Sequence, residues 1–284
     1  MIKFGPSGAG ERFYNEGYVS SEQAAKWTKE QGLDLFEYSF GRGINLREEK
    51  ALILNKAFSE NNIKLSVHAP YYINFANPDE EKAENSYRYV IDSAVMAKQM
   101  GAERVIFHPA TQGKETRETA VLRTKERLNR LAQIIHAEKL DDIIYCPETM
   151  GKLAQIGTIE EVTDFCLIDE VFMPTVDFGH VNAREQGSLK TTEDFLSRMQ
   201  YMIDKLGYER MKNFHVHFSK IQYSGKGEVR HLNFDDEIYG PDYEPFIDAC
   251  LKLKLEPNVI CESAGNQADD AMTMKSYYLS VLGK

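Results

Sequence analysis

Six acidic or imidazole side chains recur along the chain at intervals that suit one repeating structural unit. They lie 29 to 47 residues apart, each at the end of a short apolar run: His68, His108, Glu148, Asp177, His215 and Glu262. Imidazole nitrogens and carboxylate oxygens, with no thiolate among them, are ligands that suit Zn²⁺, Mn²⁺ or Fe²⁺. Because such groups would repel one another and be poorly solvated if gathered in one place, the pattern predicts divalent cations between them.

Short apolar or β-branched runs alternate with longer segments of helical periodicity, and these runs are the elements that must position the six side chains. Strands are predicted near Ile2–Gly5, Leu33–Tyr38, Lys64–His68, Arg104–His108, Ile143–Glu148, Val171–Asp177, Asn213–His217 and Asn258–Glu262. Strands that alternate with helices, at about 35 residues per unit, are typical of a parallel barrel. We therefore predict an α/β fold, a (β/α)8 TIM barrel, as one domain over residues 1–284.

The predicted ligands stand at the C-terminal ends of six consecutive predicted strands. Side chains alternate between the two faces of a strand, so His68 shares its side with Ser66, and Glu148 shares its side with Cys146. A lone histidine at a strand end is usually a hydrogen-bonded core or loop residue. Six residues that agree in residue type, in position at a strand end and in the face they occupy are harder to explain as ordinary core residues. TIM-barrel enzymes also carry out their chemistry at this end of the barrel. The pattern predicts a metal site at the C-terminal mouth.

Two connections between predicted elements are long, at residues 178–190 and 219–240, and long loops often bind ligands. His180 lies in the first and His231 in the second. Each alone is as readily a surface histidine, whereas together they could hold a further ion. His217 shares a face with His215 and could instead donate a hydrogen bond to the ligands.

The composition limits the class of partner. A net charge of −10 argues against broad, non-specific nucleic-acid binding, although bound cations would supply positive charge where a phosphate must lie. No apolar run is long enough to span a bilayer, and the first residues lack a signal peptide's apolar core. We therefore expect a cytoplasmic protein with no membrane association and no obligate protein partner.

The four cysteines are scattered along the chain, at Cys146, Cys166, Cys250 and Cys261. This spacing predicts neither a disulfide framework nor a thiolate zinc site.

Several segments carry a family resemblance. They are SVHAPYYINF around His68, FHP at His108, Glu148-Thr149, the step from Asp177 to His180, HVHFSK and Glu262-Ser263. These segments, spread over residues 64–266, resemble the signatures of endonuclease IV, the family 2 apurinic/apyrimidinic endonucleases among the xylose-isomerase-like barrels. The resemblance implies a zinc-dependent hydrolase for DNA repair that cuts damaged double-stranded DNA on the 5′ side of an abasic site.

The resemblance also implies residue roles. One zinc ion would be bound by His68, His108 and Glu148, and Glu148 would bridge to a second ion held by Asp177, His215 and Glu262, while His180 and His231 would help to bind a third. Glu148 and Glu262 would also orient the nucleophile as catalytic residues. Tyr71, directly after HAP, matches a side chain that the family inserts into the duplex, and Arg42 in FGRG is a looser match.

The chain departs from the family pattern at the third ion. It has Val229-Arg230-His231 where the family has Asp-Arg-His, and Glu228 would replace the carboxylate only if the loop bends. An alternative is a two-metal sugar isomerase or epimerase, in which Glu148 and Glu262 act as paired bases. The lost aspartate and the acidic surface favour that alternative, whereas the histidine pair and the HAPY segment favour the nuclease. A regulatory metal-binding relative without catalysis is a third reading.

Overall fold

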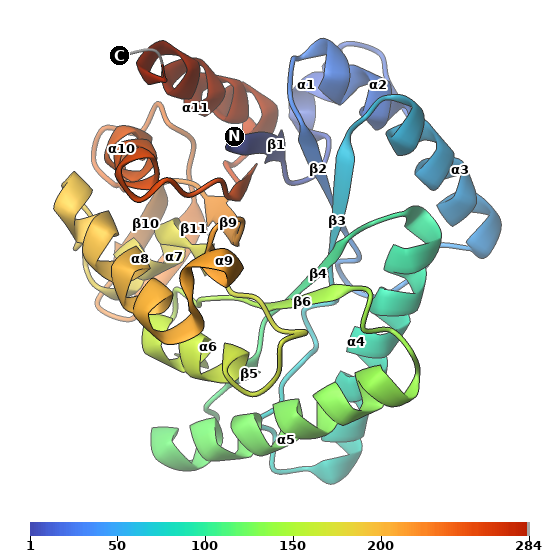
Figure 1. Ribbon diagram of the computed structural model, residues 1–284, viewed down its shortest axis with the longest axis vertical. Coiled ribbons are helices and arrows are strands. Elements are labelled where there is room, and N and C mark those ends of the chain that lie inside the picture. Colours follow the sequence, from blue (N-terminus) through green and yellow to red (C-terminus); the bar gives the residue numbers. More distant parts are fainter. Residues whose placement is uncertain (283–284) are drawn as a thin grey trace.

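Eight parallel strands close into a barrel in the computed structural model, which describes residues 1–282 (Figure 1). The barrel strands are β1 (Lys3–Pro6), β2 (Leu35–Ser39), β3 (Lys64–His68), β4 (Arg104–Phe107), β6 (Ile144–Pro147), β8 (Thr175–Asp177), β9 (His215–Phe218) and β12 (Asn258–Cys261). They form two four-stranded sheets, β1-β12-β9-β8 and β2-β3-β4-β6. Parallel bridges between Ser7 and Glu37 and between Glu148 and Thr175 join the two sheets into a ring. The predicted TIM barrel is confirmed.

Helices cover the outside of the barrel (Figure 1). They are α2 (Gln23–Glu30), α3 (Glu48–Glu60), α4 (Glu80–Met100), α5 (Arg117–Ala137), α6 (Ile159–Cys166), α8 (Thr192–Leu206), α10 (Tyr243–Leu253) and α11 (Gln267–Val281), with the shorter α1 (Gly10–Asn15), α7 (Phe178–Arg184) and α9 (Tyr208–Met211). Local signals fix where they begin. Thr158 with Glu161 and Thr191 with Asp194 form capping boxes that satisfy free N–H groups at the starts of α6 and α8.

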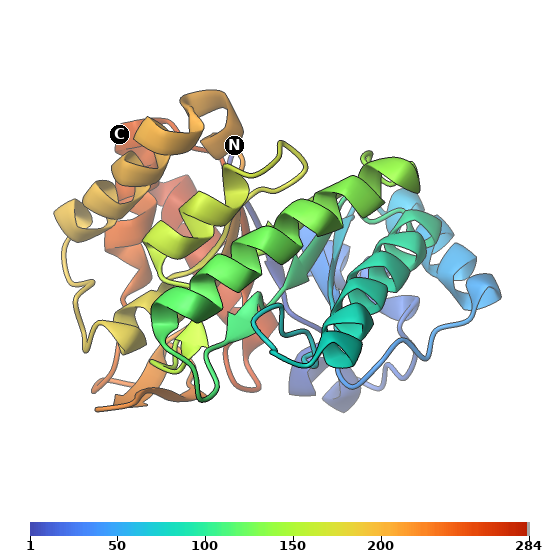
Figure 2. The ribbon, with the colours of Figure 1, turned by 90° about the horizontal axis from the view of Figure 1, so that it is seen from below.

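The two long connections contain regular structure. Residues 178–190 include α7, and residues 219–240 include a hairpin of β10 (Ile221–Ser224) and β11 (Gly227–His231). A second small pair, β5 (Ala110–Thr111) and β7 (Gln155–Ile156), is also antiparallel. Figure 2 places the hairpin at the lower edge of the molecule and the N-terminus at the upper edge. The hairpin therefore lies at the C-terminal ends of the barrel strands.

A close backbone contact fixes the position of this hairpin. Gly227 has a φ of +89°, and a Cβ there would lie 2.2 Å from the carbonyl oxygen of Gly151. The N–H of Glu228 donates to the same carbonyl at 3.1 Å. Because only glycine tolerates both this φ and this approach, Gly227 lets the hairpin dock on the loop after β6.

The apolar core lies between the strands and the helices. Side chains such as Phe36, Val67 and Val216 are buried in it, as strand alternation requires. All four cysteines are buried and free. Within residues 1–282, no helix is both long and apolar enough to cross a membrane.

Candidate metal centre

Carboxylates and imidazoles converge at the C-terminal mouth of the barrel. Their ligand atoms lie within 4.8 Å of one another in three groups: His68, His108 and Glu148; Glu148, Asp177, His217 and Glu262; and Asp177, His180 and His231. Glu148 belongs to the first two groups, and Asp177 belongs to the last two. The three groups therefore form one continuous cluster with two shared carboxylates.

Glu148 is the centre of this cluster. Its Oε2 lies 3.2 Å from Nε2 of both His68 and His108, and its Oε1 lies 3.1 Å from Nδ1 of His217. Burial disfavours the charge, but the surrounding imidazoles, His217 first, outweigh it and hold the pKa of Glu148 well below its usual value. The carboxylate is thus ionised and has both oxygens directed at ligand-type nitrogens.

Backbone carbonyls fix the orientation of two of the histidines. Nδ1 of His68 lies 2.9 Å from the carbonyl oxygen of Ala69, and Nδ1 of His180 lies 2.9 Å from that of Thr149. Because a carbonyl only accepts, each Nδ1 carries the proton, while Nε2 of His68 faces Glu148 at 3.2 Å and Nε2 of His180 faces Glu228 at 3.4 Å. This arrangement is typical of metal-binding histidines.

Asp177 has an oxygen without a hydrogen-bond partner. Its Oδ2 is buried and accepts no hydrogen bond within residues 1–282. Nδ1 of His180 lies 3.2 Å away, but its proton points to the Thr149 carbonyl. Burial raises the pKa of Asp177, and although burial also opposes the charge on His180, Asp177 and Glu148 raise the pKa of that imidazole to about 10. An unpartnered carboxylate oxygen beside a protonated imidazole fits a site built to hold a cation.

The structure differs from the sequence expectation at His215. The strand register pairs Asp177 with His217, and Thr175 with His215. Both histidines face the barrel axis, but His217 is level with the other ligands, whereas His215 lies one layer deeper. Nε2 of His215 contacts Glu37 at 3.0 Å instead of the mouth cluster. The sequence showed the shared face but not which residue reaches the mouth, because that depends on how the strands are staggered.

Glu37 was missed by the sequence reasoning. It is fully buried on β2, and its Oε1 lies 2.9 Å from Nε2 of His217. Burial opposes its charge, but His217 and His215 hold its pKa well below the usual value. The available signal was a charged residue inside the apolar segment DLFEYSF, on the face that strand alternation turns toward the axis.

A small cavity of about 180 Å³ opens over the cluster, and its lining includes His108, His180, His231 and Glu262. Glu228 also lines it, with its Oε2 3.4 Å from Nε2 of His180. The side chain of Val229 is instead half exposed. The docked hairpin therefore brings the Glu228 carboxylate to the part of the site where the family resemblance implied an aspartate and this chain has Val229.

Tyr71 and Arg42 lie at the rim of this mouth. The ring of Tyr71 is 5.5 Å from that of His68 and 5.6 Å from that of His108, and 56% of the residue is exposed. The N–H of Tyr71 donates to the carbonyl of Gly41 at 3.2 Å, so the loop that carries the exposed Arg42 lies beside it. Both residues are accessible to a ligand that covers the cluster.

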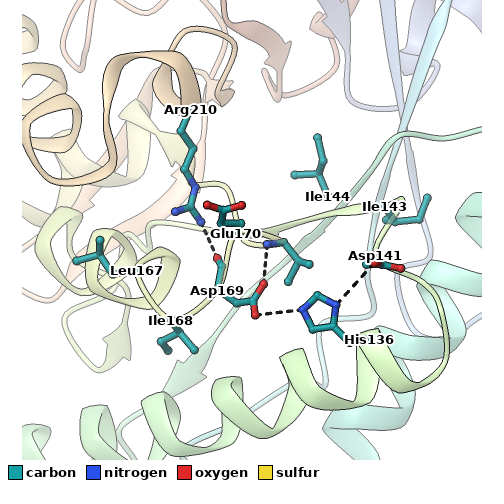
Figure 3. Close-up of a pocket in the computed structure, with 10 residues that line it drawn as sticks. His136, Asp141, Ile143, Ile144, Leu167, Ile168, Asp169, Glu170 and Arg210 are labelled. Carbon is teal, nitrogen blue, oxygen red and sulfur yellow. Dashed lines mark hydrogen bonds and ion pairs between the residues drawn. The ribbon is translucent and has the colours of Figure 1, made fainter.

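A second, larger cavity of about 710 Å³ contains a different arrangement (Figure 3). His136 lies between two acids there, with Nε2 3.1 Å from Asp169 and Nδ1 3.8 Å from Asp141. The acids contact opposite sides of the ring, and Arg210 is occupied by backbone carbonyls, including that of Asp169. These groups do not converge on one point, which favours the mouth as the chemical site.

Sequence comparisons agree with this architecture. The sequence profile of the family described as xylose isomerase-like TIM barrel matches residues 25–276. The chain is 33% identical to an uncharacterized protein of Methanocaldococcus jannaschii over 86% of this chain and 87% of that protein. It is 30% identical to a probable endonuclease 4 of Acholeplasma laidlawii over 70% of this chain and 66% of that one.

Solved structures of two different activities share the fold. Endonuclease IV from Thermus thermophilus superposes with a TM-score of 0.67 at 16% identity, over 93% of this chain and 97% of that one. A D-tagatose 3-epimerase-like protein superposes with a TM-score of 0.69 at 17% identity, over 93% of this chain and 95% of that one. At such low identity these likenesses establish the fold alone, and the activity has to be argued from the site.

Proposed function

Because this chain belongs to the xylose isomerase-like TIM barrel family, we propose that it is a zinc-dependent phosphodiesterase that cuts damaged double-stranded DNA on the 5′ side of an abasic site. The proposal depends on one observation: Glu148 joins the pair His68 and His108 to a second ligand group. One carboxylate shared between two ligand groups is suited to adjacent ions, which is the arrangement used for in-line attack on phosphate esters. The endonuclease 4 relative adds support.

The residues available as ligands divide among three places. His68, His108 and Glu148 would hold one ion, Glu148, Asp177, His217 and Glu262 a second, and Asp177, His180, His231 and Glu228 a third. Nitrogen and oxygen donors without thiolate favour Zn²⁺, and also accept Mn²⁺ or Fe²⁺. Such cations lower the pKa of water and neutralise charge on a phosphate. In this proposal Glu148 and Glu262 orient the nucleophile as catalytic residues.

The rim supplies the contacts to DNA. Tyr71 offers an exposed ring for stacking against a base or filling the gap at an abasic site, and Arg42 offers a guanidinium for a phosphate. Because the net charge of the protein is −10, we expect electrostatic attraction to DNA phosphates at the cation-loaded mouth and not over the rest of the surface. We therefore expect recognition of a lesion instead of general affinity for undamaged duplex.

The decisive experiment combines elemental analysis with a nicking assay. The zinc-loaded protein should cut a duplex containing one abasic site, leaving a 3′ hydroxyl, and should spare the same duplex without the lesion. Glu262→Gln should slow nicking about 10²- to 10⁴-fold, the usual contribution of a general base. Glu60→Gln, a change of the same type on the exposed surface of α3, should leave the rate unchanged. Absence of nicking by the fully loaded protein would refute the nuclease.

A sugar isomerase or epimerase is the second candidate, and a specific observation favours it. Glu148 and Glu262 lie in one ligand group with Asp177 and His217, which allows two carboxylates to flank a carbonyl substrate as paired bases. The same loaded protein incubated with ketoses such as D-tagatose should then form a second sugar by chromatography. Turnover of a ketose without nicking would establish this candidate in place of the first.

A further inference from the structure

A column of buried polar groups continues inward from the metal centre along the barrel axis. Nδ1 of His217 lies 3.1 Å from Glu148, and its Nε2 lies 2.9 Å from Glu37. Glu37 contacts His215 at 3.0 Å, and His215 contacts Arg104 at 3.4 Å. Barrel interiors are usually filled by branched apolar side chains. Because Glu37, His215 and Arg104 do not reach the mouth, the proposed chemistry gives these three residues no direct task.

The direction of each hydrogen bond in this column follows from its outer partner. The Arg104 guanidinium can only donate, so Nδ1 of His215 accepts and its Nε2 carries the proton. That Nε2–H donates to Oε2 of Glu37, which also accepts from the Ser66 hydroxyl at 2.7 Å. Oε2 therefore has two donors, whereas Oε1 of Glu37 accepts no hydrogen bond within residues 1–282 and lies 2.9 Å from Nε2 of His217.

His217 lies between two carboxylates, one on each side of its ring. Nε2 of His217 lies 2.9 Å from Oε1 of Glu37, an ion-pair contact in which neither atom has a hydrogen-bond partner within residues 1–282, and the nearby carboxylate favours a proton on this nitrogen. Its Nδ1 faces Glu148 at 3.1 Å and Glu262 at 3.6 Å. This differs from His68 and His180, whose protonated nitrogen is Nδ1 and whose partners are backbone carbonyls.

We propose that Glu37 is a positioning residue for the metal centre, which holds His217 with Nε2 protonated and Nδ1 directed at the ion shared with Asp177 and Glu262. A carboxylate behind a metal-binding imidazole fixes its tautomer and increases its basicity as a ligand. His215, Ser66 and Arg104 hold the Glu37 carboxylate in place and balance its buried charge. The inference rests on the proposed metal centre, but it does not depend on DNA as the substrate.

Zinc affinity provides the first test. We would measure zinc content and competition with a chelator for wild type, Glu37→Met, Glu37→Gln and Thr175→Val. Thr175 is the matched control, because it is fully buried at the level of His215 and its hydroxyl has no partner within residues 1–282. Glu37→Met should weaken one ion about 10- to 100-fold and leave the ion at His68 and His108 unchanged.

Glu37→Gln should lose less affinity than Glu37→Met, because its amide oxygen can still lie beside Nε2 of His217 and favour a proton there. Thr175→Val should match wild type. Equal zinc affinity of Glu37→Met and Thr175→Val would overturn the proposal. Zinc binding with these effects but without DNA nicking would leave this inference intact and refute only the nuclease, whereas the converse result would refute only the role of Glu37.

A spectroscopic measurement does not depend on whether the methionine variant folds. Long-range ¹H–¹⁵N correlation spectra of the zinc-loaded wild type, labelled at histidine, report which ring nitrogen carries a proton. His217, assigned by the loss of its signals in His217→Gln, should be protonated at Nε2. A proton on Nδ1, or a metal-bound Nε2 as expected if Glu37, His215 and His217 themselves held a cation, would contradict the inference.

Discussion

His180 at the mouth carries a proton that a bound cation has to displace. Burial opposes the charge on His180, yet Asp177 and Glu148 raise its pKa to about 10, so its Nε2 is protonated at pH 7 in the metal-free protein. Zinc binding at this position should release that proton, and the apparent affinity should fall about tenfold for each unit that the pH is lowered. Titration calorimetry in buffers of different ionisation enthalpy measures the release. Identical heats in all buffers would contradict this charge assignment.

Tyr71 and Tyr72 form a matched pair for testing contact with the substrate. Each is 56% exposed, but Tyr71 lies beside His68 and His108, whereas Tyr72 packs near Tyr89 with ring centroids 6.1 Å apart. Tyr71→Ala should weaken binding to an abasic-site duplex by about 1–3 kcal/mol, the contribution of one stacking contact. Tyr72→Ala should bind as wild type does in the same fluorescence anisotropy titration. Equal losses from both changes would place the DNA elsewhere.

Single residues also show how far sequence reasoning reaches. Residue type and strand position placed His68, His108, Glu148, Asp177 and Glu262 at one mouth, since strand ends converge there in any such barrel. The choice between His215 and His217 required the stagger between β8 and β9, which is set by packing over the whole barrel. Glu37 was hidden for a similar reason, because its partners are distant in sequence.

At the scale of elements, the eight strands were predictable and the loops were not. The predicted strand for β3 matches the observed bounds, and the others shift at their ends by a few residues because hydrogen bonding, and not hydrophobicity, defines them. The segment 219–240 has no strong periodicity, so its β10–β11 hairpin was not foreseen. The bend that brings Glu228 into the site depends on the contact of Gly227 with Gly151, which a single sequence does not reveal.

This hairpin leads to a prediction about the third ion. Glu228→Gln should weaken zinc binding at His180 and His231 by at least about tenfold, because the neutral amide is a poorer ligand than the carboxylate. Glu237→Gln, on the same connection but exposed, is the control and should have no effect. Stepwise removal of zinc with a chelator, followed by elemental analysis, measures the change. An unaltered third step would show that Asp177 suffices as the carboxylate there.

At the scale of the whole molecule, ligands contributed by distant strands should couple metal binding to stability. A ligand at 100 times its dissociation constant stabilises the folded state by about 2.7 kcal/mol. For a barrel of this size that corresponds to about 5–10 °C in Tm for each ion, at about 2–4 °C per kcal/mol. Thermal denaturation with zinc and with a chelator measures the shift. Ca²⁺, which prefers oxygen ligands, should raise Tm much less, and an equal rise would point to a different set of donors.

Each barrel strand has an inward face that carries polar residues of the site and an outward face that carries apolar residues of the core. On β3 the side chains of Ser66 and His68 join the polar network, while those of Leu65 and Val67 lie in the apolar core. Even-numbered positions of β3 therefore have to suit the polar network, and odd-numbered positions have to pack in the apolar core. Substitutions at the outward-facing positions can change thermal stability without altering the inward-facing polar residues. Thermal stability and catalytic chemistry can therefore evolve separately at alternating positions of one strand.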